Sequence, residues 1–252
     1  LLGADDYAVL APHFGLDGPP NFEDQCWNLR VVTPLERVAA ALGLPLDECE
    51  ARLARARAAL LAAREQRVHP GRDEKVLTSW NALMVKGLAR AGSAFGQPQW
   101  VESARRALDF IRATLWKDGR LLATCKDGRA HLNAYLDDHA FLLDALLELM
   151  QTDFRVEDVG FAQALAEVML DQFEDQERGG FYFVSHDHEQ LIHRAKVGHD
   201  NATPSGNGVA AFALQRLGHL LGEPRYVTAA ERTIGLFYEG LAGQASGYAS
   251  LL

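Results

Sequence analysis

Cysteine is scarce in this chain, and its distribution excludes two classes of protein. The three cysteines, Cys26, Cys49 and Cys125, lie far apart among 252 residues. Their number is odd, so the sequence has neither a disulfide framework nor the Cys-x-x-Cys spacing of zinc and redox motifs. This usage indicates a reducing compartment, and we expect a cytoplasmic location. We expect Cys125 to be a small buried hydrophobic residue rather than a nucleophile.

Long apolar runs and an excess of basic residues are also missing. No segment approaches the roughly 20 apolar residues of a membrane-spanning helix, so we expect no membrane partner. The formal net charge of −9 argues against nucleic acid as a partner, because phosphate backbones are bound by clustered Lys and Arg. The hydrophobic content of 48% predicts a sizeable folded core. The first residues, Leu1 to Asp6, show neither an initiator Met nor a signal-peptide pattern, which predicts a fragment.

Three stretches share one pattern, polar residues followed by apolar ones at the start of a predicted helix. They are Ser79-Trp80-Asn81-Ala82-Leu83-Met84, Asp137-Asp138-His139-Ala140-Phe141-Leu142 and Ser205-Gly206-Asn207-Gly208-Val209-Ala210. A second helix and a Gly-bearing turn follow each of them. A two-helix repeat of about 60 residues is typical of stacked helical hairpins, which bury their apolar faces against one another. We therefore predict an all-α fold, an α/α array or toroid, whose polar helix starts gather around one mouth.

The predicted elements divide the chain between residues 32 and 33. Residues 1–32 lack helical periodicity beyond a turn of helix at 4–14, which predicts an irregular connector, and residues 33–252 are expected to form a partial toroid. Thr33, Pro34 and Glu36 predict a capping box at the first helix. The other predicted helices span 46–67, 100–116, 136–150, 161–173, 205–221 and 225–241, with a further one beginning near residue 80. Short β-ribbons are expected at 121–124 and at 181–184 with 193–197.

Four segments occur in the same order as in a known protein family. They are Lys75-Val76-Leu77-Thr78-Ser79-Trp80-Asn81, Tyr135-Leu136-Asp137-Asp138, Gly179-Gly180-Phe181-Tyr182 and Asp200-Asn201-Ala202-Thr203-Pro204-Ser205-Gly206-Asn207. Through them residues 21–231 resemble the region after the thioredoxin-like domain in the spermatogenesis-associated, thioredoxin-domain-containing family, also called the YyaL type. The resemblance implies a six-hairpin, glycosidase-like α/α toroid, similar to that of N-acylglucosamine 2-epimerases. It implies no established reaction.

The resemblance also bears on partners and completeness. In the family a thioredoxin-like domain of the same full-length protein accompanies the toroid, and nothing resembling that domain is present in this chain. A six-hairpin ring at the observed spacing needs on the order of 350 residues, so we expect an incomplete ring. An open ring exposes apolar hairpin faces, which favours a homo-oligomer.

Asp138 and Asp200 are the predicted catalytic residues. Asp137 and Asp138 are adjacent at a helix start, so their side chains diverge, and one of them is expected to cap the helix. If the other faces the cavity, it can pair with Asp200, since two carboxylates about 6.5 to 9.5 Å apart carry out inverting glycoside hydrolysis. Sugar epimerisation is the alternative, with His139 and His199 as acid and base. The family usually has an aromatic residue at both histidine positions.

Side chains near the same helix starts are candidates for binding a sugar. Aromatic rings offer flat apolar faces, and amide and hydroxyl groups offer hydrogen bonds. The predicted ligand-binding residues are Trp80, Asn81, Tyr135, His139, Asn201, Ser205 and Asn207. The alternative for the polar ones is structural, because the N–H groups of helix starts also need hydrogen-bond partners.

Two functional hypotheses remain open from the sequence. In the first, the toroid mouth binds a carbohydrate or similar polyhydroxylated ligand, as in a glycoside hydrolase or sugar epimerase. In the second, the domain is a non-catalytic scaffold or client-binding domain attached to a thioredoxin-like domain. An enzyme that uses Asp138 and Asp200 needs both in one pocket, and a scaffold does not. His186, His188 and His193 are expected on a solvated loop, so we predict no metal and no cofactor.

Overall fold

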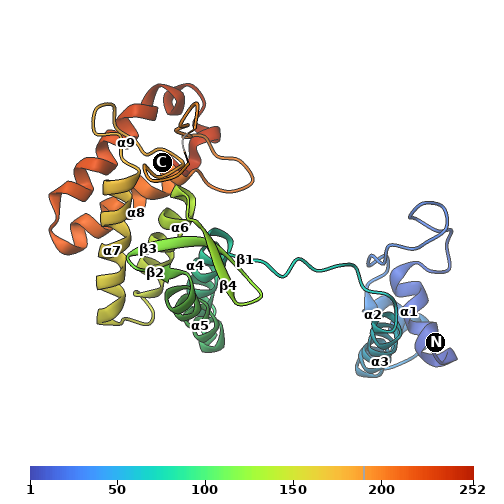
Figure 1. The fold of residues 1–252 in the computed structure, drawn as a ribbon. Helices are drawn as coiled ribbons and strands as arrows, with labels where there is room; N and C mark the ends of the chain where they lie inside the picture. Colours follow the sequence, from blue (N-terminus) through green and yellow to red (C-terminus); the bar gives the residue numbers. More distant parts are fainter. Residues whose placement is uncertain (190) are drawn as a thin grey trace. The chain divides into compact units, whose positions relative to one another are not determined.

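The computed structural model describes residues 1–189 and 191–252. The chain divides into two compact units, Leu1–Asp73 (unit 1) and Glu74–Leu252 (unit 2) (Figure 1). The sequence predicts the boundary at residues 32 and 33 instead, with the helices of residues 33–65 in the toroid. In the structure these helices pack with the first residues of the chain, so the boundary falls after them.

Unit 1 consists of α1 (Ala4–Phe14), α2 (Leu35–Leu42) and α3 (Leu46–Glu65). Val9 and Leu10 of α1 are buried in one core with Leu53 of α3. The turn of helix expected at residues 4–14 of the connector is a complete helix of 11 residues, and contacts far along the chain stabilise it. The predicted capping box is not formed, because Pro34 occupies the N-cap position and no side chain caps α2.

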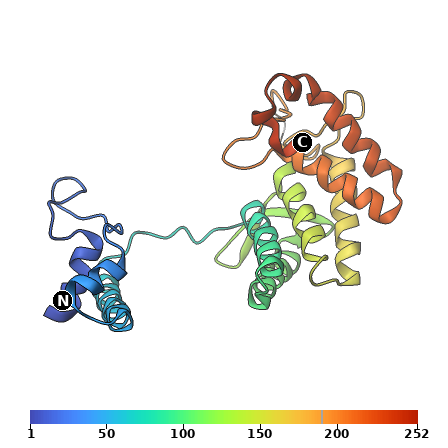
Figure 2. The ribbon, with the colours of Figure 1, turned by 180° about the vertical axis from the view of Figure 1, so that it is seen from behind.

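Unit 2 contains three helical hairpins, as predicted. They pair α4 (Thr78–Ala94) with α5 (Pro98–Thr114), α6 (Leu136–Leu149) with α7 (Val156–Gln172), and α8 (Gly206–Leu221) with α9 (Pro224–Gly243). A 3-10 helix, η1 (Ala245–Leu251), follows α9 and packs against α8. α6 packs against both α4 and α8, and Figures 1 and 2 show it between them. We call α4, α6 and α8 the inner helices.

α6 forms the centre of the hydrophobic core. Its residues are buried along its whole length except Asp137 and Glu148, which are half-buried. A helix that is covered on nearly all sides needs apolar residues on nearly all sides, and leucine, alanine and phenylalanine supply them here. The two half-buried acids therefore mark the part of α6 that its neighbours leave open.

A small antiparallel sheet contains the link between the first and second hairpins and the residues just before the first hairpin. It contains β1 (Val76–Leu77), β2 (Trp116–Lys117), β3 (Arg120–Lys126) and β4 (Arg129–Asn133), with β3 in the centre. The ribbon predicted at residues 121–124 is thus present and longer than expected. Cys125 pairs with Val76 in this sheet and is buried, in agreement with its predicted structural role.

The ribbon predicted for residues 181–184 and 193–197 does not form strands. Phe181 makes an isolated bridge with Glu174, and the N–H of Phe183 donates to the carbonyl of Ala195 at 2.9 Å. Gly179 and Gly180 have positive φ angles of 78° and 72° and form the turn before this segment. Among the described residues, no helix is both long enough and apolar enough to cross a membrane.

Candidate functional site

Asp138 joins the starts of two inner helices. Its Oδ1 accepts a hydrogen bond from the N–H of Ser79 at 2.8 Å, and its Oδ2 accepts one from the N–H of Tyr135 at 2.9 Å. The second bond is part of a capping box at the start of α6. Burial raises the pKa of Asp138, and the N–H groups of Tyr135 and Ser79 act against that rise. Both carboxylate oxygens of this predicted catalytic residue thus hold backbone together.

Asp137 lies on the other side of α6 and faces the start of α8. A Cβ atom added to Gly206 would lie 2.0 Å from Oδ1 of Asp137, so a larger residue at this position of α8 would displace the carboxyl group of Asp137. Burial raises the pKa of Asp137 to about 6, with a further contribution from the charge of Asp138. Within the described part of the chain, Asp137 has no hydrogen-bond or ion-pair partner. A carboxyl group with this pKa can donate or accept a proton near neutral pH.

Asp200 lies in the loop before α8 and bonds Ser205, the N-cap residue of that helix. It accepts hydrogen bonds from the N–H of Ser205 at 2.8 Å and from the N–H and hydroxyl of Ser250. Burial alone would raise the pKa of Asp200, but these hydrogen bonds outweigh it and lower the pKa below its usual value. Asp200 thus connects the loop before α8 to η1. Asp138 and Asp200 thus accept hydrogen bonds from separate sets of backbone partners.

Asn207 and Ser205 hold the loop between α7 and α8 against the start of α8. The amide nitrogen of Asn207 donates to the carbonyls of Phe181 and Val197 at 2.9 and 3.0 Å, and its oxygen accepts from the N–H of Phe181 at 2.7 Å. The hydroxyl of Ser205 donates to Val197 and accepts from the N–H of Gly208. Both side chains are buried. Their hydrogen bonds match the structural alternative for these predicted ligand-binding residues.

His139 is fully buried beside the ring of Phe173, with 5.0 Å between ring centroids. Its Nδ1 lies 2.9 Å from the carbonyl oxygen of Tyr135. Burial lowers the pKa of His139 to about 4, so the ring is neutral at pH 7. The ring of Tyr135 stacks on Phe183 with centroids 4.9 Å apart. Because His139 is buried in the protein interior, its ring is not placed for direct contact with a substrate.

The remaining predicted residues are more accessible. Trp80 is 66% exposed near the start of α4, so its ring can take a sugar face. The side-chain amide of Asn81 donates to the carbonyl of Leu77 at 2.8 Å. Asn201 is exposed, and its side-chain oxygen accepts a hydrogen bond from the N–H of Ala202. Of the predicted set, Trp80 and Asn201 therefore present the most surface to a ligand.

A charged cluster that was not predicted from the sequence joins the three inner helices. The carboxylate of Asp144 on α6 lies 2.6 Å from Nζ of Lys86 on α4 and 3.2 Å from Arg216 on α8. Asp144 follows Asp137 by seven residues and therefore shares its face of the helix. This spacing is a signal that sequence reasoning could have used. The cluster connects all three inner helices at a point about 10 Å further along α6 than Asp137.

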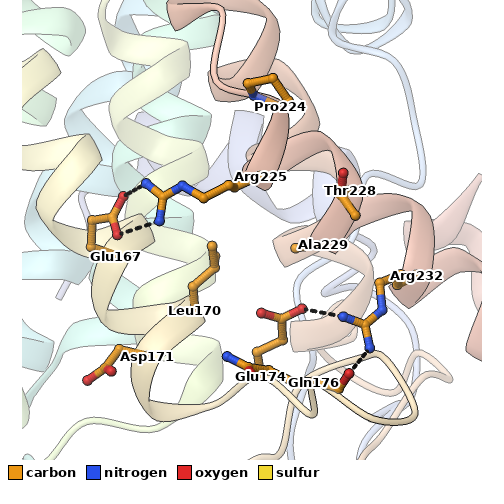
Figure 3. A pocket seen from close by; sticks show the side chains of 10 residues that line it. All are labelled: Glu167, Leu170, Asp171, Glu174, Gln176, Pro224, Arg225, Thr228, Ala229 and Arg232. Atoms are coloured by element: carbon orange, nitrogen blue, oxygen red, sulfur yellow. Dashed lines mark hydrogen bonds and ion pairs between the residues drawn. The ribbon is translucent and has the colours of Figure 1, made fainter.

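A well-formed hollow of about 590 Å³ lies away from the predicted residues, between α7 and α9 (Figure 3). Two ion pairs span it, Arg225 with Glu167 at 2.8 Å and Arg232 with Glu174 at 3.4 Å. Arg225 and Arg232 lie seven residues apart on α9, which is about two turns of helix. Glu167 lies on α7, and Glu174 follows the end of that helix. None of the predicted site residues lines this hollow. Among the described residues, no group of three potential ligands is placed to hold a metal ion.

Comparison with known proteins supports the fold and the relationship. No family model matches the chain. Human spermatogenesis-associated protein 20 is 32% identical over 230 residues, which are 83% of this chain and 29% of that protein. The mouse protein of the same name is also 32% identical, over 85% of this chain and 30% of its own length. The chain therefore spans about three tenths of the curated relatives it matches.

Solved structures of carbohydrate enzymes share the fold. Cellobiose 2-epimerase from Spirochaeta thermophila gives a TM-score of 0.53 at 21% identity, over 66% of this chain and 44% of the other. An α-1,6-mannanase variant of Salegentibacter, solved with α-1,6-mannotriose, gives 0.53 at 17% identity, over 64% and 46%. The predicted all-α toroid is thereby confirmed, with less than half of each solved chain represented. The chain is accordingly a member of the spermatogenesis-associated protein 20 family that carries part of a six-hairpin, glycosidase-like α/α toroid.

Proposed function

We propose that the starts of the inner helices bind a carbohydrate or similar polyhydroxylated ligand, and that Asp137 is the acid or base that acts on it. The observation that carries this proposal is the environment of Asp137. Its half-buried carboxyl group faces the start of α8, has a pKa raised to about 6 and makes no hydrogen bond within the described residues. Such a group is available for proton transfer near neutral pH.

The solved neighbours support the sugar class. Their names describe a cellobiose epimerase, mannanases, and an unsaturated glucuronyl hydrolase. The mannanase variant that was solved with mannotriose is described as inactive, and two adjacent aspartates have been replaced in it. Asp137 and Asp138 are also adjacent. This parallel favours a paired role for the two residues here, in which Asp138 fixes the helix starts and Asp137 transfers the proton.

The proposed roles differ from those expected for Asp138 and Asp200. Because backbone N–H groups occupy both carboxylates, we assign them positioning roles. Trp80 offers a stacking face for the ligand, and its exposure of 66% leaves room for one. In glycoside hydrolysis Asp137 would protonate the leaving oxygen, and in epimerisation it would return or remove a proton beside a carbonyl.

A non-catalytic scaffold is the second candidate function. It is favoured by the hydrogen bonding of Asp138 and Asp200, since both carboxylates accept bonds from backbone N–H groups, as structural residues do. In this case the domain would support a thioredoxin-like domain of the same full-length protein. The experiment below separates the two candidates, because a scaffold of this kind has no sugar ligand.

The test is a thermal-shift titration of the natural polypeptide with cellobiose and with α-1,6-mannotriose. A ligand at 100 times its Kd stabilises the folded state by about 2.7 kcal/mol, which corresponds to about 5 to 10 °C for a domain of this size. We expect a shift in the wild type and its loss in Asp137→Asn. Asp171→Asn is the matched control, since it makes the same chemical change at an exposed residue of α7. This variant should keep the thermal shift. A shift that Asp137→Asn retains contradicts the assigned role, and no shift with either sugar favours the scaffold.

A further inference from the structure

The 3-10 helix η1 is fastened to the start of α8. It packs against both α8 and α9, and its residue Leu251 is buried in the core of unit 2. The N–H of Asp200, in the loop before α8, donates to the carbonyl of Gly247 in η1 at 2.7 Å. η1 is therefore an integral part of unit 2, and it contacts the loop and the helix at the same place.

Ser250 makes the central contact between η1 and this loop. Its N–H donates to Oδ2 of Asp200 at 2.9 Å, and its hydroxyl donates to Oδ1 of the same carboxylate. Oδ1 also accepts a hydrogen bond from the N–H of Ser205, the N-cap residue of α8. Hydrogen bonds to an ionised carboxylate are stronger than those between neutral groups. One carboxylate thus joins η1 firmly to the N-cap.

The first turn of α8 has room for Ser250 because it contains a glycine. A Cβ atom added to Gly208 would lie 2.1 Å from Oγ of Ser250 and 2.8 Å from its Cβ. Glycine is a poor helix former compared with alanine, so local propensity does not favour it at this helical position. The close approach of Ser250 gives it a physical reason.

The same turn of α8 holds Gly206 against Asp137. Gly206 follows the Ser205 cap directly, and a Cβ atom added to it would lie 2.0 Å from Oδ1 of Asp137. Gly206 is buried and Asp137 is half-buried, so the backbone of α8 shields one side of this carboxyl group from water. The position of that backbone depends on the N-cap, which fixes the first turn of a helix.

We infer that Ser250 is a positioning residue for Asp137, because through Asp200 and Ser205 it holds the first turn of α8, and Gly206 with it, against the carboxyl group. Every contact in this series lies within unit 2, and none of them depends on an exposed surface. The inference rests on the proposed function for its catalytic meaning, whereas the contact between Gly206 and Asp137 can be tested without any ligand.

An NMR titration of protein labelled with ¹³C at glycine and aspartate tests the inference. In the wild type we expect the Gly206 signal to change with the ionisation of Asp137, because the carboxyl group lies against it. Ser250→Ala removes the hydroxyl bond to Asp200. We expect a smaller Gly206 response and an Asp137 midpoint lower by about one unit, an about 10-fold loss of proton affinity, because water then reaches the carboxyl group. Asp138, whose charge also raises the pKa of Asp137, is unchanged.

Gly208→Ala is a second variant that acts from the other side of the contact. Alanine favours the helix, but its Cβ would displace Ser250. This variant should therefore reproduce both effects without weakening α8 itself. Ser103→Ala is the matched control, since it removes a serine hydroxyl that bonds a backbone carbonyl on α5. It should leave the Gly206 response and the Asp137 midpoint unchanged.

Equal Gly206 responses and equal midpoints in the wild type and both variants overturn the inference, even where the wild type binds a sugar as proposed. A wild-type Gly206 signal that does not follow Asp137 also overturns it. A wild-type midpoint near pH 4 contradicts the proposed proton transfer by Asp137 instead, and the loss or retention of the Gly206 response then decides whether Ser250 positions the helix start. Circular dichroism verifies the fold of each variant.

Discussion

The two junctions on either side of α6 use adjacent aspartates in different ways. At the junction with α4, both oxygens of Asp138 accept backbone hydrogen bonds. At the junction with α8, Asp137 faces Gly206 without a hydrogen-bond partner among the described residues. Consecutive helical residues point about 100° apart, so one step along the chain separates them. The comparison shows that one residue can hold the helix starts in place while its neighbour keeps a titratable group available.

Replacing Asp138 should have the largest effect on stability. Asp138→Ala removes two hydrogen bonds to an acidic group and leaves the N–H groups of Ser79 and Tyr135 without that acceptor, a loss of about 3 to 5 kcal/mol. Urea unfolding followed by circular dichroism measures it. Asp138→Asn keeps one acceptor oxygen and should lose roughly half as much. A loss below about 1 kcal/mol in the alanine variant would mean that the α4 junction does not depend on this carboxylate.

Replacing Asp137 should have a smaller effect of opposite sign. Its pKa is raised to about 6 from 3.8 in the fold, so folding binds a proton more tightly and ionisation destabilises the native state. The ionised carboxylate lowers the free energy of unfolding. This loss develops as the pH rises from about 4 to 6 and is complete above that range. Asp137→Asn should therefore be more stable than the wild type by about 3 kcal/mol at pH 7.5, and this advantage should vanish near pH 4.

Urea unfolding of both proteins at several pH values gives the difference directly, because titrations of other groups cancel between them. A constant difference across this pH range would show that the pKa of Asp137 is close to its ordinary value. If Asp137→Asn gains stability and loses ligand binding, it shows the trade-off between stability and function that is common at functional sites.

Much of the fold could be predicted because it depends on local patterns. Helical periodicity and Gly-bearing turns located every hairpin of unit 2, and the start of α6 at Leu136 agrees with the prediction. The helix predicted at 205–221 agrees with α8, although its N-cap, Ser205, was not predicted as a cap. The unit boundary could not be predicted in the same way. The burial of Val9 depends on α3, far along the chain.

The candidate site was harder to predict than the fold. Asn207 was selected as a ligand-binding residue, but its amide bonds Phe181, 26 residues earlier, and such a contact leaves no local signal. By contrast, the sequence does contain a local signal that shows which of Asp137 and Asp138 caps the helix. Once Tyr135 is the N-cap, Asp138 occupies the third helical position, from which a carboxylate reaches back to the cap N–H.

The pKa of Asp137 tests the central claim most directly. It can be measured from the carboxyl carbon chemical shift in ¹³C-labelled protein during a pH titration, with Asp137→Asn used to assign the signal. We predict a titration with a midpoint near pH 6. A midpoint near 4, the value of an ordinary solvent-exposed aspartate, would contradict the account, because both aspartates of α6 would then be structural or exposed groups without a poised proton.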